Sequence, residues 1–257
     1  MQLNTGNNAT LASNPELSVV IPVYNEAGAI VSLLREVTSI LDNKICHEII
    51  IVDDCSDEGF YKSLELKLGR LELESKNAAS KIKLYRNKIN LDCYRNKREA
   101  ISKASNKWVI ILDSDNVIDK SYLDALENNF YESNVKRVYC PEFARPNFDY
   151  RIFSGNFFHA KNCAFQTHTK QFHWLINTMN YCVNRDRYLK VWDGTIDPHT
   201  ADTAYQNYNL IMDGCSLFVV PGMQYDHLVH SGSHYKNNVH KTGNLFEELI
   251  EKFKQMK

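Results

Sequence analysis

Short apolar runs separated by amphipathic stretches make up the first half of the chain. The runs at 19–23, 49–52 and 108–112 are rich in Val and Ile, which is the composition of strands buried on both faces of a parallel sheet. Between them, apolar residues recur at helical spacing and predict helices, and one alternating segment predicts a further strand. The helices are expected at 30–41, 58–73 and 92–104, and the further strand at 81–85. Alternating strands and helices indicate a parallel, right-handed α/β layer.

The pattern changes after the first half. Residues 132–200 are aromatic and Asn-rich, with prolines that interrupt any long element. Long segments of this kind in compact domains are usually functional loops, and we expect the same here. A helix is predicted at 202–212, a strand at 217–220 and an amphipathic helix at 245–256. The last helix is expected to pack on its own domain, because its polar face mixes both charges instead of being basic.

Composition narrows the class of protein. The chain has 257 residues, 44% of them hydrophobic, and a formal net charge of −1. This fits one large domain and gives no basic field for nucleic acid. The seven cysteines never occur as Cys-x-x-Cys, which favours reduced thiols over a zinc site or disulfides. No run approaches the roughly 18–20 apolar residues of a membrane span. We therefore expect a cytoplasmic protein with at most peripheral contact to the inner face of a membrane.

Acidic residues follow three of the apolar runs: Asn25-Glu26, Asp53-Asp54 and Asp113-Ser114-Asp115. In parallel sheets ligands bind where the carboxyl ends of the strands open into a crevice. Two carboxylates at i and i+2 after a strand point the same way and can bind a divalent cation. The pattern indicates chemistry on a metal-bound nucleotide.

These segments, in this order and at these separations, resemble the family-2 glycosyltransferases of the GT-A fold. The matching residues are 18–26, 52–57 and 112–115. The similarity continues from Tyr94 to Ala100, with Lys97 and Arg98 in place of the family's glycine, and through 177–185. At Ala201-Asp202 the family usually has Glu-Asp.

The resemblance implies a mainly parallel Rossmann-like sheet flanked by helices, with an irregular acceptor-side half. A polar tail would span 1–16. The glycosyltransferase domain would span 17–242, with a nucleotide-binding half at 17–118 and an acceptor half at 119–242, followed by the C-terminal helix at 243–257.

The resemblance also implies a donor site for a nucleotide-diphospho-sugar, UDP-linked by expectation. Pro22, Tyr24 and Glu26 would line the nucleoside pocket, and Asp53 or Asp54 would accept from the base. Arg95 would lie near the base or a phosphate. The remaining donor residues would be Asp113 and Ser114, near ribose or the donor sugar.

The resemblance assigns metal, base and acceptor as well. Asp115 would coordinate Mn²⁺ or Mg²⁺, helped by His227 or His230. Asp202 would be the general base of an inverting transfer, unless it only caps the helix that follows. The acceptor, a saccharide or lipid-linked saccharide in surface polysaccharide or glycoconjugate synthesis, would meet Trp174, Asn180 and Arg185. Phe172 and His173 are further stacking candidates.

Other classes of protein compete with this interpretation. The run 110–117 also resembles the nucleophile motif of haloacid-dehalogenase phosphatases, in which Asp113 would attack phosphate and Asp115 would act as acid and base. That family places the motif on its first strand, whereas it would be the fourth here. A dinucleotide-binding oxidoreductase would need a Gly-x-Gly-x-x-Gly turn, which the chain lacks, and a nucleotidyltransferase would need a Gly-rich, basic triphosphate loop after the first strand. A non-catalytic nucleotide-sugar-binding protein remains open, and Ala201 favours it.

Overall fold

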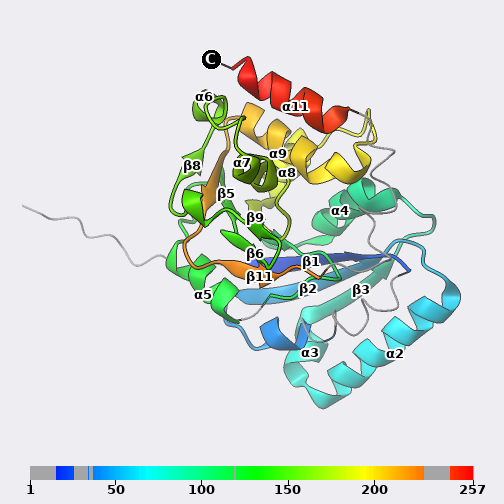
Figure 1. The fold of residues 1–257 in the computed structure, drawn as a ribbon. Helices are drawn as coiled ribbons and strands as arrows, with labels where there is room; N and C mark the ends of the chain where they lie inside the picture. The colour runs from blue at the N-terminus through cyan, green and yellow to red at the C-terminus, as the bar shows by residue number, and fades with distance from the viewer. Residues whose placement is uncertain (1–15, 26–33, 35–36, 119, 229–243, 257) are drawn as a thin grey trace, which may run out of the picture.

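An eight-stranded sheet forms the centre of the protein (Figure 1). The computed structural model describes residues 16–25, 34, 37–118, 120–228 and 244–256. The strand order is β3-β2-β1-β4-β9-β5-β10-β8, with bounds β1 (Leu17–Val23), β2 (Cys46–Asp53), β3 (Ile82–Arg86), β4 (Trp108–Ile111), β5 (Arg137–Cys140), β8 (Phe157–Phe158), β9 (Cys182–Asn184) and β10 (Ser216–Val219).

The first four strands of this order are mutually parallel, as the sequence predicts. Strand β9 runs antiparallel to β4 and β5 on either side of it, and β8 runs antiparallel to β10 at the edge. The sheet is therefore mainly parallel but mixed, with the antiparallel strands confined to the second half of the chain.

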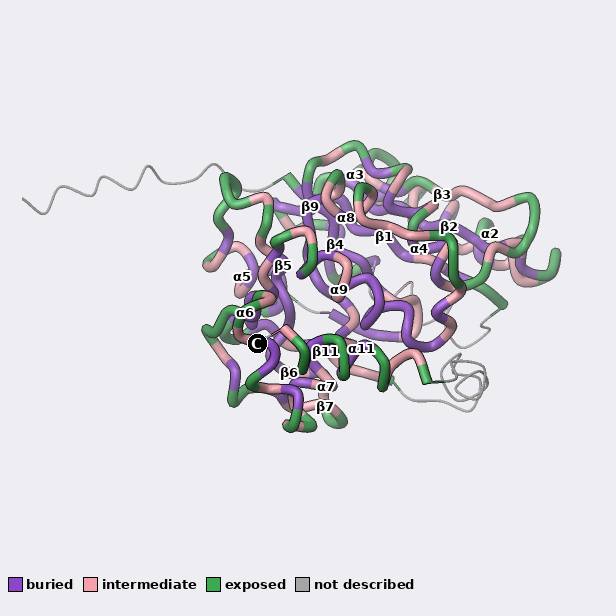
Figure 2. Tube along the Cα trace, turned by 90° about the horizontal axis from the view of Figure 1, so that it is seen from above, coloured by how far each residue is buried: buried purple, intermediate pink, exposed green. Residues whose placement is uncertain are grey.

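Helices cover both faces of the sheet, which is why its central strands β1 and β4 are mostly apolar and buried. Alternate residues of β2 belong to different cores, Ile49 and Ile51 to one and Ile50 and Val52 to the other. Figure 2 shows buried residues concentrated in the central strands β1 and β4, and exposed residues mainly in helices and loops. The helices are α2 (Glu58–Glu74), α3 (Lys76–Lys81), α4 (Asp92–Lys103), α5 (Lys120–Asn128), α6 (Ala160–Cys163), α7 (Lys170–Ile176), α8 (Arg185–Val191), α9 (Asp202–Met212) and α11 (Leu245–Lys254), with short 3₁₀ turns η1 (Arg151–Phe153) and η2 (His199–Ala201).

The prediction of an irregular segment at 132–200 is wrong in part. This region contains β5 and β9, which complete the central sheet, together with α6, α7 and α8. These elements are short, from three to seven residues. Elements of that length carry too few apolar repeats to show a clear period in the sequence.

A second sheet of three short strands, in the order β11-β6-β7, lies beside the end of β4. Its strands are β6 (Phe143–Arg145), β7 (Phe148–Asp149) and β11 (Gln224–Asp226). Val117 pairs with Asp226 in an isolated antiparallel bridge. This bridge brings the residues after β11 next to the loop that follows β4.

Most predicted element boundaries agree with the structure to within a few residues. Helix α9 spans the predicted residues, and α2 continues through Gly69 without a break. Of the helix predicted at 30–41, residues 34 and 37–41 are described and helical. The predicted tail at 1–16 lies almost wholly outside the described residues.

Helix α11 packs on its own domain, as predicted. Leu249, Ile250 and Phe253 are buried, and Phe253 makes edge-to-face contacts with Phe172 and Tyr208. No helix in the described part of the chain is long and apolar enough to cross a membrane. All seven cysteines are free.

Candidate functional site

The three acidic strand ends lie side by side, in the order β2-β1-β4. Val23 is paired with Asp53, and the Asp54 N–H donates to the Val23 carbonyl at 2.8 Å. On the other side Val20 pairs with Ile111, so the same register continued by two residues sets Asp113 level with Pro22. The sequence-based prediction that these ends share one rim is confirmed.

The loops after β1 and β2 are held together by reciprocal hydrogen bonds. The Asn25 N–H donates to Ser56 Oγ at 2.8 Å, and the Asp57 N–H donates to Asn25 Oδ1 at 2.8 Å. Asn25 and Cys55 have left-handed backbone conformations, with φ of 42° and 61°. For cysteine this conformation is uncommon, and such residues concentrate at binding sites. Tyr24 is 50% exposed beside this junction, which leaves its ring free to stack on a base. Glu26 lies outside the described residues.

Asp53 and Asp54 point in different directions. The Asp53 carboxylate is fully buried, where Oδ2 accepts from the Ser56 N–H at 3.1 Å and lies 3.3 Å from Arg86 Nε. Asp54 Oδ1 accepts from Asn87 Nδ2 at 2.8 Å and from the Leu91 N–H at 2.9 Å. Burial is the main cause of the raised pKa of Asp54. Both carboxylates therefore organise loops, and Asp54 is the one directed to the side of α4.

The loop after β4 is anchored by Asn180. Its Oδ1 accepts from the Asp113 N–H at 2.9 Å, and the Asn116 N–H donates to the Asp113 carbonyl at 3.1 Å. Asn180 is fully buried in a left-handed conformation. Asn180 thus holds the backbone of the loop that contains Asp113, whereas the sequence predicts that it contacts an acceptor. Ser114 and Asp115 are partly exposed.

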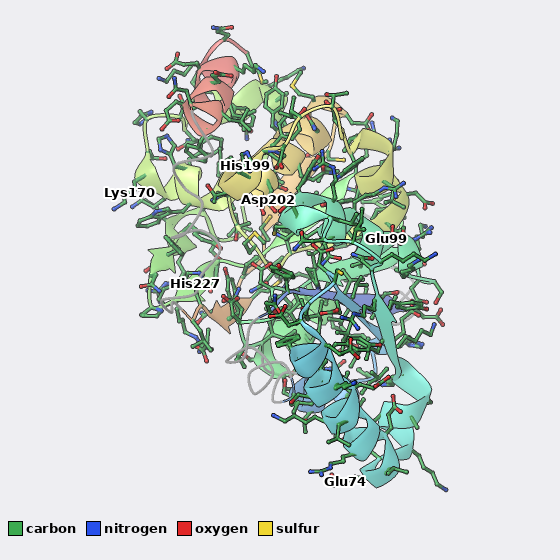
Figure 3. All side chains as sticks on the ribbon, turned by 90° about the vertical axis from the view of Figure 1, so that its right-hand side faces the viewer. Glu74, Glu99, Lys170, His199, Asp202 and His227 are labelled. Atoms are coloured by element: carbon green, nitrogen blue, oxygen red, sulfur yellow. The ribbon has the colours of Figure 1, made fainter. Side chains whose placement is uncertain are left out.

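Lys97 links Asp113 to Asp202. Its Nζ lies 2.7 Å from Asp202 Oδ2 and 3.6 Å from Asp113 Oδ1, and the side chain is only 4% exposed. Burial alone would lower the pKa of Lys97, but the two carboxylates outweigh it and raise that pKa well above its usual value. One buried ammonium, carried by α4, therefore joins the end of β4 to the start of α9. Figure 3 shows Asp202 at this end of α9, next to α4.

Asp202 does not act as a helix cap. It is the first residue of α9, the N-cap is Ala201, and no side chain caps this end. Besides Lys97, the carboxylate contacts Cys93, whose Sγ is 3.6 Å from Oδ2, and Thr203, whose Oγ1 is 3.4 Å from Oδ1. The Asp202 carboxylate is thus held by side chains and does not cap the backbone of α9.

Burial raises the pKa of Asp113, with a further contribution from Asp202, while Lys97 and His227 act in the opposite direction. His227 follows the bridge between Val117 and Asp226 and therefore lies near the same loop. Burial lowers the pKa of His227, so its imidazole is neutral at pH 7. His230 lies outside the described residues.

The chemistry of these side chains fits Mn²⁺. Carboxylate oxygens suit Mg²⁺ and Mn²⁺ alike, and an imidazole nitrogen is a ligand of transition-metal ions, so a site with both ligand types is compatible with Mn²⁺. In the stretches that the structure describes, no three His, Cys, Asp or Glu side chains form a metal-binding group. A metal held by Asp115 and His227 would therefore take further ligands from substrate phosphate, as nucleotide-bound cations do.

Asn147 orients His227. Its Nδ2 lies 3.2 Å from His227 Nδ1, and the Phe148 ring packs on the imidazole with centroids 5.1 Å apart. With the amide rotated by 180°, Oδ1 would accept from Nδ1–H, and the imidazole would then present Nε2 as a ligand.

The other predicted site residues are not all brought together. Trp174 packs edge-to-face on Phe148, and the ring of Phe148 also packs on His227. Arg95, in the first turn of α4, lies 3.7 Å from Asp197, which precedes α9. Arg185 lies at the opposite end of β4, because the antiparallel β9 pairs Asn184 with Trp108, and its Nη2 donates to the Ser102 carbonyl. This position gives no support to the acceptor role predicted for Arg185, and we leave it out of the proposed site.

Two stacking candidates also have structural roles. Phe172 is fully buried in the core under α11. His173 Nε2 lies 2.7 Å from the Thr167 carbonyl. Sequence reasoning missed the roles of Lys97 and Asn180. The sequence does contain one signal that could have identified Lys97, namely a charged residue at a position where the resemblance expects glycine.

Comparison with known proteins supports the family resemblance that the sequence shows. The family model described as "Glycosyl transferase family 2" matches residues 18–192. Polypeptide N-acetylgalactosaminyltransferase 11 of Xenopus tropicalis is 34% identical over 146 residues, 55% of this chain and 23% of that protein. Polypeptide N-acetylgalactosaminyltransferase 3 of Drosophila melanogaster is 28% identical over 176 residues, 67% of this chain and 24% of that protein. The chain thus spans about a quarter of the length of these curated relatives.

Solved structures share the fold. The mannosyltransferase PcManGT from Pyrobaculum calidifontis, in complex with GDP-Man and Mn²⁺, superposes with a TM-score of 0.64 at 14% identity, covering 96% of this chain and 71% of that one. GalNAc-T7 with UDP, GalNAc and Mn²⁺ gives a TM-score of 0.61 at 16% identity, covering 93% and 50%. The fold is the GT-A fold that the sequence predicts, and the haloacid-dehalogenase interpretation is not supported. The chain belongs to glycosyl transferase family 2.

Proposed function

We propose that the protein transfers a sugar from a nucleotide-diphospho-sugar to a hydroxyl group, with a divalent cation and with inversion at the anomeric carbon. The observation that carries the proposal is the joining of Asp113 and Asp202 by Lys97. The ammonium of Lys97 contacts both Asp113, which follows β4, and Asp202, which begins α9 in the second half of the chain. A donor sugar and its acceptor hydroxyl have to meet at such a junction.

Each residue of the proposed site would have a separate role. Tyr24, Asp54 and the β4 loop would hold the nucleoside and ribose, and Asp115 with His227 would hold the cation. When bound, the cation neutralises charge on the departing diphosphate. Asp202 would take the proton of the acceptor hydroxyl as its oxygen bonds to the anomeric carbon. The bond from that carbon to the diphosphate breaks, and the diphosphate leaves with the electron pair.

The relatives suggest a donor and an acceptor. They are named polypeptide N-acetylgalactosaminyltransferases, and one solved structure contains UDP and GalNAc. We therefore favour a UDP-linked donor, as the sequence predicts, and add a polypeptide hydroxyl to the saccharide and lipid-linked saccharide acceptors. Phe148 packs on His227 and Trp174 packs on Phe148, and these two rings would contact the acceptor.

A second function, nucleotide-sugar binding without catalysis, has one observation in its favour. Ala201 stands where the resemblance expects Glu, and a relative 31% identical over 130 residues is the mouse "Inactive polypeptide N-acetylgalactosaminyltransferase-like protein 5". Binding of donor without any release of nucleoside diphosphate would identify this function.

A thermal-shift panel tests the binding step. A ligand that binds only the native state raises its stability in proportion to the logarithm of its concentration over Kd. UDP, GDP and their sugar conjugates are compared with and without Mn²⁺. A Mn²⁺-dependent rise in Tm with UDP supports the proposal. A response only to phosphate mimics such as fluoroaluminate would contradict it.

A further inference from the structure

Lys97 has a geometry that a purely structural ion pair would not need. Its ammonium carries three N–H donors, but only the contact with Asp202 Oδ2, at 2.7 Å, is a short hydrogen bond. Met179 Sδ and Asp113 Oδ1 lie farther away, at 3.7 Å and 3.6 Å. The ammonium therefore has unused hydrogen-bonding capacity on the side of Asp113, where the donor strand ends.

The ion pair also conflicts with the role proposed for Asp202. Lys97 Nζ donates to Asp202 Oδ2 at 2.7 Å, and this charged hydrogen bond competes with a bond from the hydroxyl of an acceptor. The pair is buried, so solvent screens it little. We expect Asp202 Oδ2 to be open to the hydroxyl of an acceptor only after Lys97 Nζ has moved away from it.

The donor supplies a reason for Lys97 to move. A nucleotide-diphospho-sugar brings two negatively charged phosphates to the loop that contains Asp113. In a buried site such an anion competes with Asp202 for the same ammonium. The shift needed is small, since Lys97 already lies between the two carboxylates.

We propose that Lys97 is a positioning residue that holds Asp202 when no donor is bound and turns toward the donor diphosphate when it binds, freeing Asp202 as a base. This inference rests on the proposed function. It adds that the base becomes available only in the donor complex.

Thermodynamic reciprocity makes the inference testable by binding alone. If donor weakens the Lys97–Asp202 pair, the pair must weaken donor binding by the same factor. Asp202→Asn should therefore tighten the binding of UDP, measured with Mn²⁺ by isothermal titration, by about tenfold, or about 1.4 kcal/mol. The gain should disappear when Lys97 is also replaced, so that Lys97→Met and Lys97→Met/Asp202→Asn bind UDP equally.

The double-mutant cycle separates this mechanism from simple charge removal. If Asp202→Asn tightened binding only by deleting a negative charge, the gain would persist in the Lys97→Met background. Lys97→Gln, which can still donate to Asp202 but carries no charge, replaces Lys97→Met if that variant does not fold. Lys97→Arg should keep the gain because it keeps the charge.

Lys103→Met is the matched control. Lys103 lies on the same helix, is 37% exposed and pairs with Glu99 instead of a site carboxylate. Its replacement should leave both UDP affinity and the effect of Asp202→Asn unchanged. UDP binding with no gain on Asp202→Asn, or with the same gain without Lys97, would overturn the inference and leave the proposed function standing. Absence of binding by both UDP and GDP would overturn the proposed function and the inference with it.

Discussion

The side-chain oxygen of Asn180 accepts a hydrogen bond from the backbone N–H of Asp113, at 2.9 Å. Asn180 is fully buried and left-handed, and its own carbonyl accepts from the Tyr122 hydroxyl. The loop that carries Asp113 and Asp115 thus depends on a residue from the second half of the chain. The loop after β4 is therefore supported by a segment that lies 67 residues farther along the chain.

Asn180→Ala should destabilise the protein and weaken nucleotide binding. It leaves a buried N–H without a partner and forces a side chain with no polar group into a left-handed conformation. We expect a loss of about 2–4 kcal/mol in the free energy of unfolding. Denaturant titration measures it, and UDP affinity with Mn²⁺ should fall because the Asp113–Asp115 loop loses its anchor.

Asn180→Gly is the matched control for backbone conformation. It loses the same hydrogen bond but tolerates the positive φ, so it should be more stable than the alanine variant by about 1 kcal/mol. Wild-type stability and UDP affinity in the alanine variant would show that Asn180 does not anchor the loop.

Stability should fall in acid because of Glu48, at the other end of the sheet. Its carboxylate is 4% exposed and accepts from Ser18 Oγ at 2.5 Å, Lys83 Nζ at 2.6 Å and the Ser105 N–H at 2.6 Å. Burial alone would raise the pKa of Glu48, but these partners outweigh it and lower the pKa to about 2.

The lowered pKa of Glu48 determines the direction in which stability changes with pH. Since the folded pKa lies below the unfolded value, the stabilisation is complete above about pH 4.5 and is lost as the pH falls toward 2. It amounts to about 3 kcal/mol. In Glu48→Gln this component of the pH dependence should vanish in denaturant titrations between pH 2 and 7. Glu58→Gln, at an ion-paired but 61% exposed carboxylate, should change the profile little. A Glu48→Gln profile identical to the wild type would refute the assignment.

Asp115→Asn should abolish the Mn²⁺ dependence of UDP binding without affecting the fold. The amide keeps the size of the side chain but lacks the charge that a divalent cation requires. Isothermal titration of UDP with and without Mn²⁺ measures the difference, which should shrink at least tenfold in the variant. Asp124→Asn, at an exposed carboxylate of α5 paired with Lys120, should retain the wild-type difference. If Asp115→Asn retained it too, the cation would be bound elsewhere.

The sequence predicts the donor half of the molecule well and the acceptor half poorly, for a physical reason. Strands β1, β2 and β4 are buried on both faces, so each shows as an apolar run with an acidic end, and their order could be read directly. Strand β9 has three residues and β5 four, too short for any period. The antiparallel direction of β9, which carries Arg185 away from the site, depends on pairing between segments that are distant in sequence.

Site residues that act through tertiary contact were hidden for the same reason. Asp202 was found by its position in the family pattern, but its partner Lys97 lies far away in sequence and is positioned by the packing of α4. Lys97 appeared only as an irregularity in the resemblance. Asn180 was identified as a site residue, yet its role is to support Asp113, and no sequence period could show this.

The most direct test of the whole account is the turnover of Asp202→Asn. The measurement is release of nucleoside diphosphate from a panel that includes UDP-GalNAc and GDP-Man, with Mn²⁺ and with a saccharide or a Ser/Thr peptide as acceptor. We expect the wild-type protein to release UDP or GDP in an acceptor-dependent reaction. The variant should be slower by about 10²–10⁴-fold, the usual contribution of a general base, when assayed at a temperature at which circular dichroism shows that it is folded. Turnover of the variant at the wild-type rate would contradict the assignment of Asp202 as the base and of this junction as the catalytic centre.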